Sequence, residues 1–116
     1  MKKNGIVITI VAVCAVVAGI LLWGGKETAP DSTFVLLDGS TKQTIDLRGQ
    51  VSLVNFWATS CVTCVAEMPE MVRTYEKYKG KGFGTVAVAM QYDPPSYVVN
   101  FVNSRKLPFD VAIDNT

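Results

Sequence analysis

The chain has 116 residues, with 11 basic and 10 acidic side chains and no histidine. The missing imidazole excludes Ser-His-Asp and Cys-His catalysis, histidine-ligated metals and a histidine pH switch. The nearly balanced charge offers no basic face, so we expect no nucleic-acid partner. Cysteine or carboxylate groups must therefore carry any catalytic chemistry.

An apolar run opens the chain, because residues 6–23 place 16 apolar side chains in 18 positions. Eighteen helical residues span roughly 27 Å, close to the hydrocarbon thickness of a bilayer. Lys2 and Lys3 precede the run, and such lysines stay on the cytoplasmic side of a membrane helix. We predict a membrane anchor over residues 1–23, with the chain from Gly24 onward outside the cytoplasm. A cleaved signal peptide, which has the same basic start, stays open as the alternative.

The next part of the chain predicts a tether, a hairpin and a strand. Residues 24–33 are polar and turn-rich, as linkers are. The apolar stretch 34–37 runs into Asp38-Gly39, a hairpin-turn signal, and residues 43–47 are the expected return strand. Residues 51–58 are apolar at nearly every position, which indicates a strand covered on both faces by flanking helices.

A helix is predicted over residues 62–79, since its apolar side chains recur at spacings of three, four and three. Pro69 falls inside this helix and is expected to kink it, because proline removes one backbone hydrogen bond. Gly80 and Gly82 are expected to end it. The stripe consists of Val65, Met68, Val72 and Tyr75.

The last elements complete an alternating pattern. Residues 83–90 predict a second buried strand. Asp93 followed by proline predicts a helix cap, with the helix running to about Arg105. Residues 109–113 predict a third strand. The order of a hairpin followed by β-α-β-α-β indicates one α/β domain with crossover connections, over residues 34–116.

Cys61 and Cys64 lie where the first buried strand passes into the helix. Backbone N–H groups and the positive dipole at a helix N-terminus favour a thiolate over a thiol. Three positions further on, Cys64 comes round to the same face and can close a disulfide. We therefore predict Cys61 as the exposed nucleophile, Cys64 as the shielded resolving thiol, and thiol–disulfide exchange as the chemistry.

The sequence allows three other interpretations of this cysteine pair. Half of a zinc site lacks completing ligands, because no other cysteine or histidine lies outside the apolar run; we expect no metal and no cofactor. A static disulfide in a non-catalytic, anchored interaction domain stays open. A peroxiredoxin-type peroxidase also stays open, but its nucleophile normally follows a proline by several residues. No proline lies between Pro30 and Pro69.

The segment 51–69, VSLVNFWATSCVTCVAEMP, resembles the active-site signature of the membrane-anchored TlpA/ResA-like thioredoxin family. The similarity extends from about Phe34 to the end of the chain. It implies a thioredoxin-like fold with an N-terminal β-hairpin, acting on the periplasmic side of a bacterial inner membrane. It also implies a reductase of oxidised protein thiols, such as those of apocytochrome c, that takes electrons from a membrane thiol–disulfide donor.

The resemblance assigns roles to individual residues. Cys61 and Cys64 match the redox pair of the family. Glu67 matches an acidic residue near the disulfide, and a carboxylate there could accept the proton of Cys64. Pro69 matches the helix-kinking proline. Asn55 stands where ordinary thioredoxins carry a buried acid below the disulfide, which strengthens the proton role expected of Glu67.

Some positions depart from the family pattern. Trp57 belongs either to the core or to the wall of the site. Ser60 replaces the tryptophan that usually precedes the first cysteine, so one wall of the substrate groove is expected to be smaller. Val62 and Thr63 separate the cysteines without a proline. No histidine lies between the two cysteines, so no imidazolium stabilises the thiolate, which favours a reductase over a strong oxidant.

The end of the chain departs most. After the position of Asp114, the family continues with a cis-proline loop, two antiparallel strands and a last helix. None of these is in this sequence. We therefore expect a C-terminally incomplete thioredoxin-like domain, and the activity is expected of the complete domain.

Overall fold

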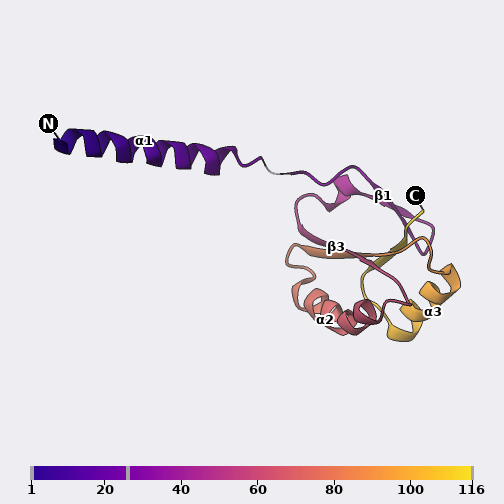
Figure 1. The fold of residues 1–116 in the computed structure, drawn as a ribbon. Coiled ribbons are helices and arrows are strands. Elements are labelled where there is room, and N and C mark those ends of the chain that lie inside the picture. Colours follow the sequence, from indigo (N-terminus) through magenta and orange to yellow (C-terminus); the bar gives the residue numbers. More distant parts are fainter. Residues whose placement is uncertain (1, 26, 116) are drawn as a thin grey trace.

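The computed structural model describes residues 2–25 and 27–115 (Figure 1). A helix is followed by a hairpin and then by alternating strands and helices. The elements are α1 (Lys2–Trp23), β1 (Thr33–Leu36), β2 (Thr41–Gln43), the 3-10 helix η1 (Thr44–Leu47), β3 (Val51–Trp57), α2 (Val62–Tyr78), β4 (Phe83–Ala89), α3 (Pro95–Arg105) and β5 (Asp110–Ile113). The predicted α/β order is therefore present.

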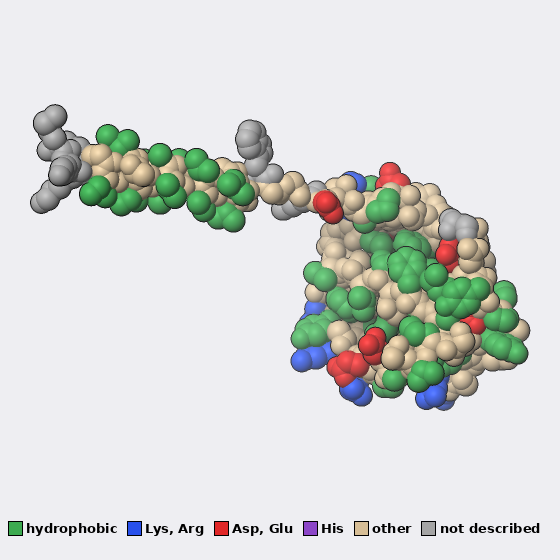
Figure 2. Space-filling model, in the orientation of Figure 1, with side chains coloured by type: hydrophobic (Ala, Val, Ile, Leu, Met, Phe, Trp, Pro, Cys, Tyr) green, Lys and Arg blue, Asp and Glu red, His purple; other side chains and the backbone are tan. Residues whose placement is uncertain are grey.

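Helix α1 stands apart from the other elements, and its large apolar side chains between Ile6 and Leu22 are exposed (Figure 2). Its segment Gly5–Leu22 has a mean hydropathy of 2.9, and none of it is buried. By length and composition this helix can cross a membrane. A signal sequence meets the same criterion, so both interpretations of the apolar run are compatible with it.

The five strands form one sheet in the order β2-β1-β5-β4-β3. Strands β3, β4 and β5 are parallel, whereas β1 is antiparallel to both of its neighbours. Trp57 pairs with Ala89, and Ala89 pairs with Ile113. The carboxyl ends of the three parallel strands therefore meet at one edge of the sheet, where the chain enters the cysteine motif.

Helices α2 and α3 lie together on one face of the sheet, below the strands in Figure 1. Met68 from α2 and Val98 from α3 pack there against side chains of the parallel strands. The buried members of this cluster are Trp57, Met68, Ala87, Ala89, Val98, Phe109 and Val111. A smaller cluster of Val86, Val88 and Ala112 lies on the other face, against Leu47 of η1.

Strand β3 differs from its prediction in one respect, because its two faces are covered only in part. It is the edge strand of the sheet, and Val51, Leu53 and Phe56 are exposed. Both helices pack on the same face, and no strand within residues 2–25 and 27–115 pairs with its outer side. The apolar run specified the strand correctly but not how much of it would be covered.

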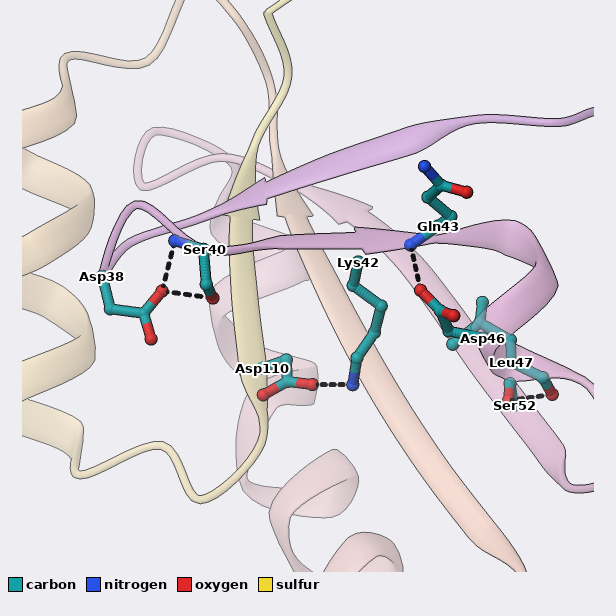
Figure 3. A network of polar contacts seen from close by, with 8 residues as sticks. All are labelled: Asp38, Ser40, Lys42, Gln43, Asp46, Leu47, Ser52 and Asp110. Carbon is teal, nitrogen blue, oxygen red and sulfur yellow. Dashed lines mark hydrogen bonds and ion pairs between the residues drawn. The ribbon is translucent and has the colours of Figure 1, made fainter.

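The return strand of the hairpin is also different from its prediction. Strand β2 covers residues 41–43, and residues 44–47 form a 3-10 turn instead of continuing the strand. The carboxylate of Asp46 accepts a hydrogen bond of 2.7 Å from the backbone N–H of Gln43 (Figure 3). This side-chain contact competes with the strand ladder and favours the turn.

Polar contacts of two aspartates, Asp38 and Asp110, hold the hairpin in place. Asp38 accepts hydrogen bonds from the hydroxyl and the backbone N–H of Ser40, at 2.6 and 2.9 Å. Both bonds lower the pKa of Asp38, and the bond from the Ser40 hydroxyl has the larger effect. Lys42 of β2 forms an ion pair with Asp110 of β5 (Figure 3). Because β1 lies between these two strands, the pair ties the hairpin to the parallel part of the sheet.

The ends of the two domain helices follow local rules, with one correction. Helix α2 ends at Tyr78, and Gly80 follows with a left-handed φ of 78°, as glycine does after helices. The prediction of Asp93 as the cap of α3 is wrong, since Pro94 is the N-cap residue. Pro95 disfavours a helical conformation for the residue before it. The helix therefore starts later, and the carboxylate of Asp93 is available for another contact.

Candidate active site

A tight turn carries the chain from β3 to α2. The backbone N–H of Cys61 donates to the carbonyl of Ala58 at 3.0 Å, which closes the turn 58–61. Cys61 is the N-cap residue of α2, with an extended backbone. The turn therefore delivers its side chain to the end of the helix where backbone N–H groups are unpaired.

Cys61 and Cys64 form a disulfide, with their Cα atoms 5.2 Å apart. The predicted pairing of the two cysteines is confirmed. The sulfur of Cys61 accepts a hydrogen bond from the backbone N–H of Cys64 at 3.3 Å. It also lies 3.6 Å from the hydroxyl oxygen of Thr63. A disulfide sulfur carries no hydrogen, so the hydroxyl is the donor. After reduction, both donors favour the thiolate of Cys61.

The two cysteines are both half-buried but differ in their surroundings. Cys64 packs against the larger core cluster. Cys61 lies beside Val62, whose exposed fraction is 82%. Cys61 therefore lies at the helix end next to an exposed side chain, whereas Cys64 lies against the protein interior.

Two of the predicted supporting residues lie on β3. Trp57 has an exposed fraction of 1%, and its ring centroid is 5.0 Å from that of Phe101. Its indole N–H has no hydrogen-bond partner among the described residues. Asn55 is half-buried and shares a sheet face with Trp57, because alternate strand residues point the same way. The structure thus places Trp57 in the core below the cysteine turn, with Asn55 further down the strand.

The other two predicted residues lie on α2. Glu67 follows Cys64 by three residues, and its side chain is exposed. Pro69 lies inside the helix and is also exposed. It lines a groove of about 270 Å³ together with Val65 of α2 and Phe101 of α3. Among the described residues, no hydrogen bond or ion pair joins Glu67 to either cysteine, so the structure brings the cysteines together without it.

Three further residues belong to the site and were not predicted from the sequence. Thr63 contacts the sulfur of Cys61. This contact could have been predicted, because a hydroxyl residue two positions after a cysteine at a helix start can reach its sulfur. Asp93 is 2% exposed, and its oxygens accept hydrogen bonds from the backbone N–H and the hydroxyl of Thr59, both at 2.6 Å. These two residues are 34 positions apart, so no local pattern connects them.

The site combines a closed dithiol pair with donors directed at one sulfur. In the part of the chain that the structure describes, no group of three or more cysteine, aspartate or glutamate side chains is arranged to hold a metal. The chemistry that the arrangement supports is the making and breaking of a sulfur–sulfur bond at Cys61.

The family model described as Redoxin matches residues 25–116. The chain belongs to the redoxin family. The expected family and the expected oxidoreductase class are both supported by named relatives. The thiol-disulfide oxidoreductase ResA of Bacillus cereus is 37% identical over 127 residues, covering 98% of this chain and 72% of the relative. ResA of Bacillus anthracis is 42% identical over 90 residues, covering 78% of this chain and 51% of the relative.

Solved structures give the same picture for this redoxin. A putative thioredoxin from Neisseria meningitidis is 42% identical, with a TM-score of 0.69, and the match covers 78% of this chain and 60% of the other. A putative thiol:disulfide interchange protein DsbE from Chlorobium tepidum is 32% identical, also with a TM-score of 0.69, and covers 76% and 61%. The predicted thioredoxin-like fold is confirmed, and the chain spans between about half and three quarters of these relatives.

Proposed function

We propose that this redoxin catalyses thiol–disulfide exchange through Cys61 and Cys64, as a reductase of protein disulfides outside the cytoplasm. One observation carries the proposal: the disulfide lies at the start of α2, with the sulfur of Cys61 facing the N–H of Cys64. A thiolate stabilised at such a position attacks a disulfide at neutral pH and is also a good leaving group.

The proposed reaction starts from the reduced dithiol. The thiolate of Cys61 attacks one sulfur of the substrate disulfide, forming a mixed disulfide and releasing the first substrate thiolate. The thiolate of Cys64 then attacks the sulfur of Cys61, which releases the second substrate thiolate. Each released thiolate takes up a proton, and two electrons have passed to the substrate. The product on the protein is the Cys61–Cys64 disulfide, and a donor dithiol reduces it again.

Glu67 is proposed to accept the proton of Cys64 before the second attack. It follows Cys64 by three residues on α2, within about one turn of the helix. Replacement by glutamine removes the proton acceptor and keeps the size of the side chain. We expect Glu67→Gln to slow the release of the mixed disulfide and to shift the pH dependence of that step. An unchanged pH–rate profile assigns Glu67 to the solvated surface of the helix.

The direction of transfer is proposed from the residues between the cysteines. Val62 and Thr63 carry no charge, so no cationic side chain in the motif itself stabilises the thiolate further. A strongly stabilised thiolate makes a pair oxidising, as in proteins with potentials near about −120 mV. Two uncharged residues favour a more reducing pair.

The location and the partners are part of the same proposal. An anchor over residues 6–23 in a bacterial inner membrane, with Lys2 and Lys3 inside, places the cysteines on the periplasmic side. The exposed apolar surface of α1 supports this arrangement. Oxidised protein thiols, for example those of apocytochrome c, are the proposed substrates, and a membrane thiol–disulfide protein is the proposed electron donor. Both partners rest on the family resemblance.

Trapping of the mixed disulfide tests the function. The chain has a third cysteine, Cys14, in helix α1. All variants carry Cys14→Ser, which removes this thiol and is itself expected to leave turnover unchanged. Cys61→Ser abolishes reduction of a disulfide-containing protein such as insulin. Cys64→Ser forms a stable mixed disulfide with that protein, because the resolving thiol is missing. Equal residual turnover in both variants, without a trapped adduct, identifies the pair as a static staple in a non-catalytic domain.

Labelling of intact spheroplasts tests the location. A membrane-impermeant maleimide is added to spheroplasts that carry the reduced protein, and labelled Cys61 is quantified by mass spectrometry. We expect labelling before lysis if the domain is outside the cytoplasm. Labelling that appears only after lysis contradicts the proposed orientation.

A further inference from the structure

Two chain turns lie next to each other at the carboxyl edge of the parallel strands. The turn 58–61 is closed by the hydrogen bond from Cys61 to Ala58. The turn 90–93 is closed by a bond of 2.9 Å from the backbone N–H of Asp93 to the carbonyl of Met90. A bond of 2.9 Å from the N–H of Met90 to the carbonyl of Trp57 connects the two turns at their bases.

The side chain of Asp93 makes the second connection between these turns. One of its oxygens accepts from the backbone N–H of Thr59, and the other accepts from the hydroxyl of the same residue, both at 2.6 Å. Asp93 is 2% exposed. Burial of a carboxylate is costly without hydrogen bonds, and bonds to an ionised acceptor are among the strong ones. No lysine or arginine among the described residues forms an ion pair with it, so the two donors of Thr59 offset that cost.

The position of Thr59 explains why this contact matters for the cysteines. Thr59 is the second residue of the four-residue turn that ends at Cys61. Its backbone N–H and its side chain are both held by one buried group, which restricts the backbone and the χ1 rotamer together. The orientation of Cys61 at the start of α2 therefore depends on Asp93.

We propose that Asp93 is a positioning residue of the redox site, which holds Thr59 so that the turn 58–61 presents the sulfur of Cys61 to an incoming disulfide. The inference rests on the proposed exchange activity of Cys61. Asp93 touches neither sulfur and acts only through Thr59. Displacement of a reacting atom by about 1 Å costs up to about a hundredfold in rate, so a loosened turn is expected to slow attack measurably.

The charge of Asp93 can be separated from its position. In Asp93→Asn, the amide oxygen can accept from the N–H of Thr59, and the amide NH₂ can donate to the hydroxyl oxygen. Both contacts then survive without the negative charge. Asp93→Ala removes both contacts, Thr59→Val removes the hydroxyl contact alone, and Thr59→Ser keeps it.

The chain also offers a matched control. Asp38 accepts bonds from the N–H and the hydroxyl of Ser40 in the distant hairpin turn, both on one oxygen of an exposed side chain. Asp38→Ala therefore removes an aspartate contact to a hydroxyl and an N–H of one turn residue, away from the redox site. If the loss of a turn contact lowers turnover merely by loosening the folded domain, turnover falls in this variant too.

The test measures two rates in the full chain with Cys14→Ser, in detergent micelles. The first is alkylation of reduced Cys61 by iodoacetamide across pH 5–10, and the second is turnover of insulin disulfides. We expect Asp93→Ala to lower turnover about tenfold. We expect Thr59→Val to lower it by a smaller factor, and the double variant to match Asp93→Ala, because the two residues act as one unit. Asp93→Asn and Thr59→Ser recover most of the rate, and Asp38→Ala is unaffected.

The outcomes separate the possible explanations. A folded Asp93→Ala with unchanged turnover and alkylation profile overturns the proposal. Asp93→Asn as slow as Asp93→Ala also overturns it, because charge and not position is then decisive. If Asp93→Ala fails to fold, the pair Thr59→Val and Thr59→Ser decides by the same criterion. Alkylation needs no protein substrate, so a wild-type protein without turnover refutes the proposed function and still leaves the positioning of Cys61 measurable.

Discussion

The hydroxyl of Thr63 offers a quantitative test of how the helix start activates Cys61. Thr63→Val keeps the shape of the side chain and removes one of the two donors to the sulfur. Hydrogen bonds to charged groups contribute about 1.5–3 kcal/mol. This one is 3.6 Å long and Thr63 is exposed, so we expect about 1 kcal/mol, below that range. Loss of a donor to the thiolate favours the thiol, so the pH midpoint of Cys61 alkylation rises by about 0.7 units.

The assay follows the iodoacetamide adduct on the Cys61 peptide by mass spectrometry, in reduced protein that carries Cys14→Ser. Thr63→Ser keeps the hydroxyl and is expected to retain the wild-type midpoint. Val62→Ala removes an exposed side chain and no donor, and is the second control. The N–H of Cys64 remains in all variants, so the midpoint stays below the value of about 8.5 for a free cysteine. A midpoint that is equal in Thr63→Val and the wild type refutes the role of the hydroxyl.

The remaining predictions concern stability and are measured by urea unfolding of the full chain in detergent. Trp57→Phe removes a buried indole N–H without a partner among the described residues, so it lowers the free energy of unfolding by less than the 3–5 kcal/mol typical of Trp→Ala. An equal decrease in Trp57→Phe and Trp57→Ala contradicts this. Met68→Ala leaves a cavity in the core and costs about 2–5 kcal/mol; a loss below 1 kcal/mol shows that α2 does not pack as described. A double-mutant cycle of Lys42→Met and Asp110→Asn yields a coupling of about 0.2–1 kcal/mol, because both side chains are about one-third exposed; a coupling that high salt leaves unchanged argues against an exposed ion pair.

The parts of the fold that follow from short stretches of sequence could be predicted. The spacing of apolar residues located α2 and the parallel strands, because periodicity reports which side chains face a core. The cysteine pair could also be predicted from a short stretch of sequence. A spacing of three residues at the start of a helix brings Cys61 and Cys64 together without any distant contact. A local contact was nevertheless overlooked at Asp46, which stands three residues after Gln43 and turns the expected strand into η1.

The parts that depend on distant residues could not be predicted. Asp93 before a proline has the local pattern of a helix cap, yet its carboxylate binds Thr59 from the neighbouring turn. Only the parallel pairing of β3 with β4 brings these turns together. The exposure of Phe56 had the same cause, since an apolar strand looks alike in the middle and at the edge of a sheet until its neighbours are placed.

Substoichiometric alkylation of the reduced protein at pH 7 tests the central claim most directly, because both cysteines compete within one molecule. The claim is that the start of α2 activates the sulfur of Cys61 and leaves that of Cys64 shielded. Peptide mapping by mass spectrometry is expected to place nearly all of the label on Cys61. Equal labelling of the two cysteines, or preferential labelling of Cys64, contradicts the account.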